Sequence, residues 1–345
     1  MNVTNDKNAT VPTILNLDEI STAHVLIIGD RMGKALENYK ESIASTLSIN
    51  TQDTVKIVIA ADNHQGLHRS LHLLKQLKKL PPVIVYHGAS EELFEKKFFS
   101  KDSETILKNI DLYQDHRIQT LLHIFPKISK FLYTLIDRVK MKALPSEDKS
   151  DYTTKEAMQA LEIGYKLYEL ELEELIQLAI AKHSQLILMT TPINFEVIPK
   201  KICEFSTSNS IMDEQNRIFG LMQSGDYKQA FSELEKLLEV MPGNALSAFM
   251  MGQTLRHLGA LTESVSYYEQ SSALECGTWR ATSVHNSIIK KHAQKYNLFL
   301  LDFHSIVNNE LGQNTLFLDE IFPQNIYYQK AVKRLTEQLK KELTL

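Results

Sequence analysis

Arg31 has the most specific chemical setting in this sequence. Residues 24–34 are His-Val-Leu-Ile-Ile-Gly-Asp-Arg-Met-Gly-Lys, a pattern that predicts a buried strand followed by a turn that opens a helix. A guanidinium at a helix N-terminus favours phosphate or carboxylate, as the helix amides do, so Arg31 could bind an anion. Alternatively, the guanidinium pairs with Asp30, Asp319 or Glu91 and fills the cleft expected at this turn. The three acidic residues expected nearby favour this second interpretation.

Two pairs of residues could supply a hydroxyl nucleophile or an imidazole base. Ser90 follows His87, and His64 follows Asp62, in each case at the predicted carboxyl end of a strand, where α/β sheets place their sites. A nucleophile must lie within hydrogen-bond reach of its base, and residues two or three apart at a strand end often point in different directions. An active dyad is therefore the less favoured interpretation. His304 is expected to be a loop histidine.

Composition excludes several classes of function. The chain has 38 Lys and Arg against 42 Asp and Glu, a net charge of -4, so no basic field recruits nucleic acid or an anionic membrane. Cys203 and Cys276 fit neither a disulfide framework nor a four-ligand zinc site, and the 12 histidines show no metal-ligand spacing. We therefore expect two reduced, buried cysteines, no bound metal and no cofactor.

The N-terminal residues 1–23 form a polar tail without an apolar run of signal-peptide length. The longest apolar runs elsewhere are as long as strands and too short to cross a membrane. We therefore expect a cytoplasmic protein without a transmembrane segment.

Strands and helices are expected to alternate along the chain. Helical patterns separate five β-branched runs, which predicts an α/β fold with a parallel sheet of about five strands, covered on both faces. A longer helical elaboration, residues 103–183, falls between the third and fourth runs. The expected strands are Val25 to Gly29, Thr54 to Ala61, Pro82 to Gly88, Gln185 to Thr191 and Leu298 to Phe303.

A repeat of about 34 residues covers 211–244 and 245–278 and resembles the tetratricopeptide repeat. We expect residues 206–276 to be an all-α insertion in an α/β domain formed by 24–205 and 277–345. Two repeats are fewer than an independent array needs, so the module should lean on that domain. It could be a helical prop or a surface for a protein partner.

Several short blocks share their order and spacing with a known family. In chain order they are Gly29-Asp30-Arg31-Met32-Gly33, Asp62-Asn63-His64-Gln65-Gly66, Tyr86-His87-Gly88-Ala89-Ser90-Glu91-Glu92-Leu93, Thr191-Pro192-Ile193-Asn194, Trp279-Arg280-Ala281 and Asp319-Glu320-Ile321-Phe322-Pro323. Together with the inserted repeats, they resemble the SGNH/GDSL hydrolase superfamily, specifically its members with tetratricopeptide repeats before the last strand. The resemblance implies a three-layer α/β/α fold, acyl hydrolysis, and an oxyanion-hole amide at Gly66.

The chain departs from the family pattern where the chemistry would occur. Arg31 stands in place of the nucleophilic serine, Phe322 in place of the histidine, and Ser90 in place of an asparagine. A guanidinium stays protonated at neutral pH, and a phenyl ring cannot accept a proton. The family's residue types are kept at Asp30, Gly66, Gly88 and Asp319. These four residues could instead have a structural role, in which the glycines form tight turns and the aspartates bond to loop backbone or cap a helix.

These departures predict a catalytically inactive, hydrolase-like protein. It would act as a scaffold or regulatory component of a bacterial-type assembly, through the repeats 211–278 and the former active-site cleft. The residues expected to bind a ligand there are Arg31, Asn194 and Arg280. The alternatives are an esterase or acyl hydrolase with displaced catalytic residues, and a sensor in which Arg31 holds an anionic metabolite.

Overall fold

The computed structural model describes residues 17–48, 54–93, 103–114, 154–200, 209–275 and 279–343. The expectations for the tail before residue 17, for Cys203 and Cys276, and for a helix continuing past residue 114 to 142 lie outside these residues.

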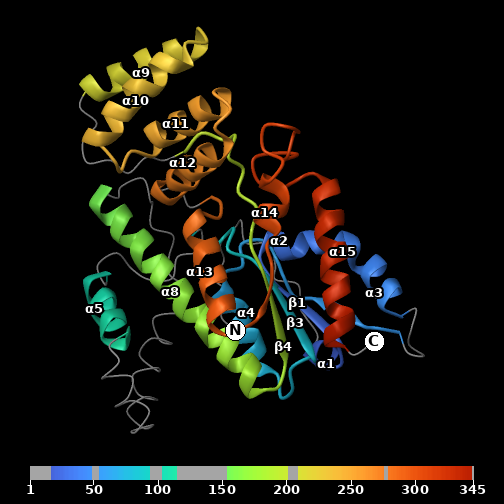
Figure 1. Ribbon diagram of the computed structural model, residues 1–345. Helices are drawn as coiled ribbons and strands as arrows, with labels where there is room; N and C mark the ends of the chain where they lie inside the picture. Colours follow the sequence, from blue (N-terminus) through green and yellow to red (C-terminus); the bar gives the residue numbers. More distant parts are fainter. Residues whose placement is uncertain are drawn as a thin grey trace, which may run out of the picture.

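Five parallel strands form the sheet, in the order β2-β1-β3-β4-β5 (Figure 1). They are β1 (Val25–Gly29), β2 (Ile57–Ile59), β3 (Val83–His87), β4 (Gln185–Met189) and β5 (Phe299–Leu301). The predicted α/β class and five-stranded parallel sheet are confirmed. The two edge strands are shorter than their apolar runs, because each pairs with one neighbour only.

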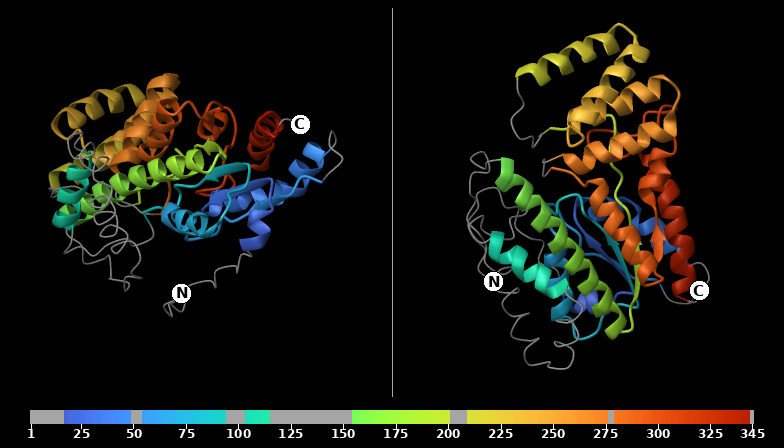
Figure 2. Two further views of the ribbon diagram at one scale, coloured as in Figure 1. Left: turned by 90° about the horizontal axis from the view of Figure 1, so that it is seen from below. Right: turned by 60° about the vertical axis from the view of Figure 1, so that its left-hand side comes forward.

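Helices cover both faces of the sheet, as the two views of Figure 2 show. One face carries α3 (Lys40–Ser48), α14 (Phe303–Asn308) and α15 (Asn325–Glu342); the other carries α1 (Leu17–Ser21), α4 (Leu67–Gln76), α8 (Thr154–Ala181) and α13 (Ser283–Lys295). The short α2 (Arg31–Lys34) and a 3-10 turn (Ala35–Tyr39) follow β1, and α5 (Ser103–Gln114) packs on α8.

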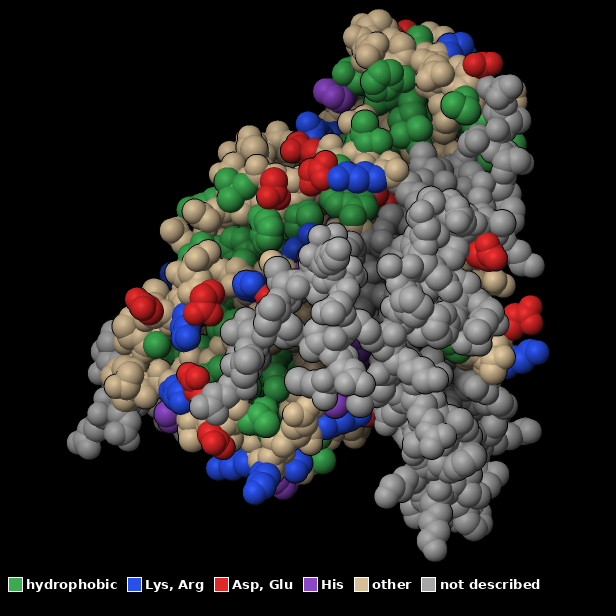
Figure 3. Space-filling view, turned by 180° about the vertical axis from the view of Figure 1, so that it is seen from behind, with side chains coloured by type: hydrophobic (Ala, Val, Ile, Leu, Met, Phe, Trp, Pro, Cys, Tyr) green, Lys and Arg blue, Asp and Glu red, His purple; other side chains and the backbone are tan. Residues whose placement is uncertain are grey.

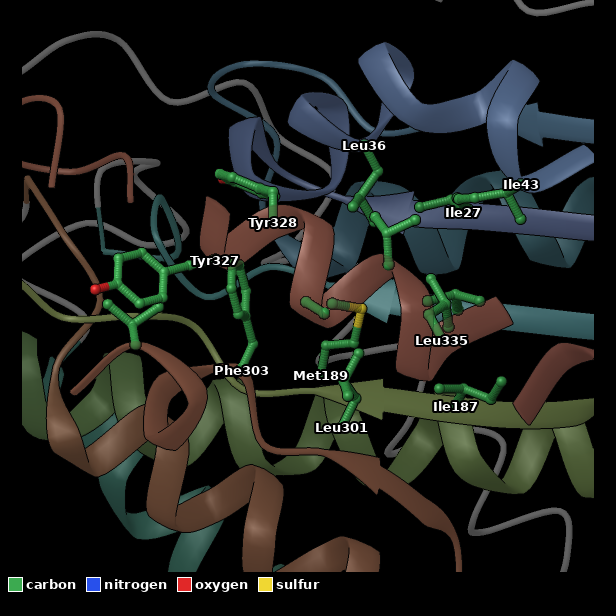
Figure 4. Packing of buried hydrophobic residues seen from close by; sticks show 14 of the residues in the cluster. Ile27, Leu36, Ile43, Ile187, Met189, Leu301, Phe303, Tyr327, Tyr328 and Leu335 are labelled. Carbon is green, nitrogen blue, oxygen red and sulfur yellow. The ribbon is translucent and has the colours of Figure 1, made fainter. Parts of the chain in front are cut away.

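Side chains of each strand alternate between the two faces, as the two-residue period of a strand requires. In β1, Val25 and Ile27 join the core beneath α3 and α15, whereas Leu26 and Ile28 join the core beneath α4 and α8. Figure 4 shows the first of these cores, where Ile27 lies near Leu36 and Leu335. Because both faces are buried, the strands are continuous apolar runs in the sequence.

Four further helices lie between β4 and β5 in the chain and extend away from the sheet (Figure 1). We call them the helical array: α9 (Asn209–Gln223), α10 (Tyr227–Val240), α11 (Ala245–His257) and α12 (Leu261–Leu274). The array has a hydrophobic core of its own, which includes Ile218, Leu234 and Met251. Its α12 packs on α13 of the α/β fold.

None of the helices in the described ranges is long and apolar enough to cross a membrane.

Candidate functional site

The loops after β1 and β3 begin side by side at the carboxyl edge of the sheet. Gly29 and His87 are partners at the last register position of these strands. With β1 between β2 and β3, this is the point where the strand order reverses, which is where open α/β sheets place their ligand sites. Gly29 has φ +135°, and a Cβ there would lie 1.9 Å from the carbonyl oxygen of His87, so only glycine fits.

Asp30 is buried, and its carboxylate holds three backbone amides. Oδ1 accepts from the Met32 amide at 2.9 Å, and Oδ2 accepts from the amides of Ser90 at 2.5 Å and Glu91 at 2.9 Å. Burial raises the pKa of Asp30 to about 7, against the lowering effect of the hydrogen bond from Met32. The carboxylate therefore caps α2 and ties it to the loop after β3.

The guanidinium of Arg31 is directed into this edge of the protein. Nε donates to the hydroxyl of Ser90 at 2.8 Å, and Nη2 donates to the carbonyls of Ser90 at 3.3 Å and Trp279 at 2.5 Å. Nε also lies 3.8 Å from a carboxylate oxygen of Glu91, and the Arg31 side chain is only 18% exposed. Of the three acidic partners considered from the sequence, Glu91 is the one that pairs with Arg31.

Glu91 also contacts His64 from the loop after β2. Its Oε2 accepts from the His64 amide at 2.5 Å, and its Oε1 lies 3.4 Å from Nδ1 of the imidazole. The imidazole is about half exposed, whereas the carboxylate is buried. These groups border a hollow of about 220 Å³, which is lined by Arg31, His64, Glu91, Lys200, Trp279, Glu320 and Ile321.

Gly66, the residue expected at the oxyanion hole, and Gly88 both lie at this edge. Gly66 precedes α4, and the next amide, that of Leu67, donates to the buried carboxylate of Glu92 at 2.6 Å. The carbonyl of Gly88 accepts from the hydroxyl of Thr191, which ties the loop after β3 to the loop after β4. Glu92, which lies in the third block and had no role assigned from the sequence, is thus bonded to the start of α4.

Ser90 and His87 do not face the same groups. The Ser90 hydroxyl is bonded to Arg31, whereas His87 points into the core against Phe303, with 5.7 Å between ring centroids. Neither ring nitrogen of His87 has a hydrogen-bond partner among the residues that the structure describes. Burial lowers the pKa of His87 to about 3, so the imidazole is neutral. It has the surroundings of a core residue.

The second pair considered from the sequence is also divided. Asp62 accepts from Lys34 at 2.6 Å and from the Asn63 amide at 2.8 Å, while the imidazole of His64 lies beside Glu91. His304 lies at the start of α14 and is buried, and burial lowers its pKa to about 4.

The last block forms a tight loop before α15. One carboxylate oxygen of Asp319 accepts from the amides of Ile321 and Phe322, both at 2.7 Å. The carbonyl of Asp319 accepts from the side-chain amide of Asn194 at 3.0 Å, and Phe322 is half-buried. Asp319 and Asn194 therefore hold loop backbone in place.

A buried ion pair lies next to this loop, and sequence reasoning missed its acidic member, Glu275. Arg280 donates to Glu275 at 2.7 and 2.9 Å and to the carbonyl of Asn194 at 2.7 Å. Glu275 also accepts from the Trp279 indole at 2.7 Å and the Lys200 amide at 2.8 Å. We call this group the joint, because it connects the end of α12 to the loop after β4. The only signal in the sequence is an acid five positions before Arg280.

The edge is rich in carboxylates, but their arrangement does not suggest a metal centre. Among the described residues, no group of three or more His, Cys, Asp or Glu side chains could hold a metal ion. The oxygens of Asp30 face backbone amides, and Glu91 faces Arg31 and His64. The hydroxyl at this edge, that of Ser90, is bonded to the guanidinium of Arg31. A guanidinium cannot accept the proton of the hydroxyl, so Arg31 cannot act as its base.

No family model and no curated protein matches this chain. Among solved structures, it is similar to a proposed acylhydrolase from Bacteroides fragilis NCTC 9343, with 11% identity, a TM-score of 0.39, and 92% of this chain and 87% of that chain covered. It is also similar to a point mutant of an acetyl-xylooligosaccharide esterase from Geobacillus Stearmophilus, with 10% identity, a TM-score of 0.38, and 95% and 97% covered. Similarity at this level transfers neither activity nor site residues.

Proposed function

We propose that this protein is a non-hydrolytic relative of the SGNH/GDSL hydrolases that works by binding a protein partner. The observation that carries the proposal is the position of Arg31. Arg31 stands at the sequence position where the resemblance to the family implies the nucleophile. Its guanidinium is bonded to the hydroxyl and carbonyl of Ser90 and to the carbonyl of Trp279, and it lies beside Glu91.

These contacts favour a filled pocket over an anion site. Arg31 already faces a buried carboxylate, and a second anion would have to compete with Glu91 for the same positive charge. At the position expected for a catalytic histidine, Phe322 offers no proton acceptor. Acyl transfer needs an attacking hydroxyl and a base, and neither position supplies one.

We infer that the helical array consists of two tetratricopeptide repeats, inserted as residues 206–276. Positions 34 apart have equivalent environments, which supports this inference. Gly225 and Gly259 both have φ +83°, and Ala230 and Ser264 are both fully buried. The hydroxyl of Ser264 donates to the carbonyl of Gly252 at 2.7 Å, where two helices of one hairpin approach closely. Such modules present helix surfaces to proteins.

An esterase assay tests the loss of hydrolysis. Purified protein should turn over short-chain p-nitrophenyl esters no faster than the Ser90→Ala variant does. An equal melting temperature of the two proteins shows that the variant is folded. The double variant Arg31→Ser with Phe322→His returns the missing residue types and is the positive comparison. Turnover by the unmodified protein that Ser90→Ala abolishes would overturn the proposal.

One observation favours a second candidate, an acyl hydrolase with displaced residues. His64 and Glu91 form an imidazole-carboxylate pair at the border of the hollow, with Nδ1 3.4 Å from the carboxylate. Such a pair can act as a general base when a nucleophile or a water lies at the other ring nitrogen. If this candidate is correct, esterase activity should exist and fall at least about 100-fold in His64→Ala. The matched control is His68→Ala, on α4.

Partner binding is tested separately. Cross-linking of the full chain in cells of its source, followed by peptide mass spectrometry, should give cross-links to another polypeptide that start within residues 209–274. Cross-links confined to the α/β fold would argue against the array as the contact surface.

A further inference from the structure

The exposed side of α9 carries a stripe without charged residues. Its members recur at helical spacing and are all exposed: Met212, Asn216, Phe219, Gly220 and Gln223. Met212 is 50% and Phe219 45% exposed, although both are large and apolar. The opposite side of α9 packs on α10 and α11 through Ile218 and Met222. The helix therefore carries large apolar side chains on two sides, but only one of these sides is covered by the array.

Gly220 is an independent sign that another backbone approaches here. It lies in the interior of α9, where glycine is the poorest helix former after proline. A Cβ added to Gly220 would meet no described atom within 4 Å, so no contact among the described residues requires glycine there. Close packing of a partner helix against this position would explain why glycine stands there.

The free side of α9 is accessible to a large partner. In Figure 1, α9 forms with α10 the end of the molecule that lies farthest from the sheet. Figure 3 shows hydrophobic side chains at the surface of the array, at the upper right of the view from behind. A partner helix could therefore lie along α9 without contacting the α/β fold.

We propose that the partner is a second copy of this chain, with the two α9 helices packed antiparallel about a two-fold axis at Asn216. Met212 and Gly220 each lie one helical turn from Asn216, on opposite sides. The axis therefore sets Met212 of each copy over Gly220 of the other, a large side chain against a small one. It also sets Asn216 beside its copy, where the two amides can each donate and accept.

Charges beside the stripe fit the same arrangement. Asp213 and Arg217 lie one turn apart on one flank of α9. In the antiparallel pair this flank meets its own copy in reversed order. With the axis at Asn216, the level of Asp213 lies two residues, about 3 Å along the helix, from the level of Arg217 of the other chain, within reach of that long side chain. Asp213 makes no ion pair within the described part of the chain, whereas Arg217 pairs with Glu233 and remains half exposed. Charge complementarity thus selects the antiparallel orientation.

This inference rests on the part of the proposed function that gives the array a partner-binding role. It does not depend on the loss of hydrolysis, because an active and an inactive hydrolase site would leave α9 unchanged. One helix pair buries less surface than a standard interface, so the association should be weak, with a Kd on the order of 10 to 100 µM.

Sedimentation equilibrium of the full chain, from about 1 to about 300 µM, tests the dimer. The mean mass should rise from one chain toward two, and Phe219→Lys should weaken association at least about tenfold. The matched control is Ser232→Lys on the exposed side of α10, which should associate as the unmodified protein does. A single-chain mass throughout the range would overturn the proposal, and it would leave another protein as the partner of α9.

Gly220→Leu separates the proposed packing from general hydrophobic association. Leucine favours the helix and adds apolar surface, so general association would tighten, whereas packing of Met212 over Gly220 predicts weakening of at least about tenfold. Asp213→Lys, an exposed change, should weaken association about threefold to tenfold by placing like charges together. Unchanged or tighter association of Gly220→Leu would overturn the arrangement, even if the protein dimerises.

Discussion

Two groups of buried carboxylates are stabilised in different ways: those at the sheet edge beside Arg31, and that of the joint beside Trp279. At the sheet edge, Asp30, Glu91 and Glu92 are each at most 3% exposed, and Arg31 lies 3.8 Å from one oxygen of Glu91. Their other partners are mainly amides of the surrounding loops. At the joint, Glu275 is fully buried, with the guanidinium of Arg280 at 2.7 Å.

This difference distinguishes the candidate site at the sheet edge from the joint, which is a structural connection. At the sheet edge, backbone amides hold the acidic side chains in position, and burial raises the pKa of Asp30 to about 7. The joint is neutral as a unit, and its hydrogen bonds are satisfied within the protein. Variants of the two groups should therefore respond differently to truncation and to pH.

Glu275→Ala should have the largest effect. It leaves the Arg280 guanidinium buried without a carboxylate and removes the acceptor of the Trp279 indole and the Lys200 amide. The free energy of unfolding should fall by about 3 to 5 kcal/mol. Urea unfolding followed by the fluorescence of Trp279, the only tryptophan, measures it. Glu196→Ala, which removes an exposed partner of Arg256, is the control and should cost less than about 1 kcal/mol.

Asp30→Asn should remove a pH dependence. The folded protein holds the proton of Asp30 up to a pKa of about 7, but the unfolded chain loses it near 3.8. Between these values the folded state binds more protons, so stability falls as pH rises. From about pH 5 to about pH 8, the unmodified protein should lose about 3 kcal/mol that the variant does not lose.

Taking the difference between the two proteins at each pH isolates Asp30. The lowered pKa values of His87 and His304 act in the opposite direction, but they contribute equally to both proteins. A constant difference across this range would show that Asp30 does not titrate there.

Arg31→Ala should have an intermediate effect. It leaves Glu91 without its cation and removes the donor to the Ser90 hydroxyl, while the opened space admits water. A loss of about 1 to 3 kcal/mol in the free energy of unfolding is expected. Arg31→Met keeps most of the volume but no donor; equal losses in both variants would assign the effect to hydrogen bonding rather than packing.

Lys200→Ala should have the smallest effect on stability. Its Nζ lies 4.1 Å from the centroid of the Trp279 ring and pairs with the exposed Glu320, while its backbone amide bond to Glu275 is retained. A loss below about 1 kcal/mol is expected, with a change in Trp279 emission. A loss as large as that of Glu275→Ala would mean that the joint depends on this side chain.

The sequence was sufficient to predict the sheet and the loops of the candidate site. Apolar runs such as Val25 to Gly29 identify the strands because both faces of the sheet are buried. Parallel strands bring their carboxyl ends together, so the loop of Arg31 and the loop of Ser90 were expected at one edge.

The partners within that edge could not be predicted. Ala89 has φ +79°, an uncommon conformation that helps decide where the next side chains point, and the sequence does not indicate it. Glu91 therefore could not be chosen over Asp30 or Asp319 as the partner of Arg31. The bond from Arg31 to the Trp279 carbonyl joins residues 248 positions apart, which no local pattern reports.

The joint also has a consequence for how the chain folds. Strand β4 ends at Met189 and its neighbour β5 begins at Phe299, so the last strand pairing must close a long loop, which costs entropy. The Lys200 amide bonds to Glu275, at opposite ends of the array, at 2.8 Å. Once the array has folded and this bond has formed, the open loop is reduced to the segments 190–199 and 276–298, the second of which contains α13. Early folding of the array would therefore speed completion of the sheet.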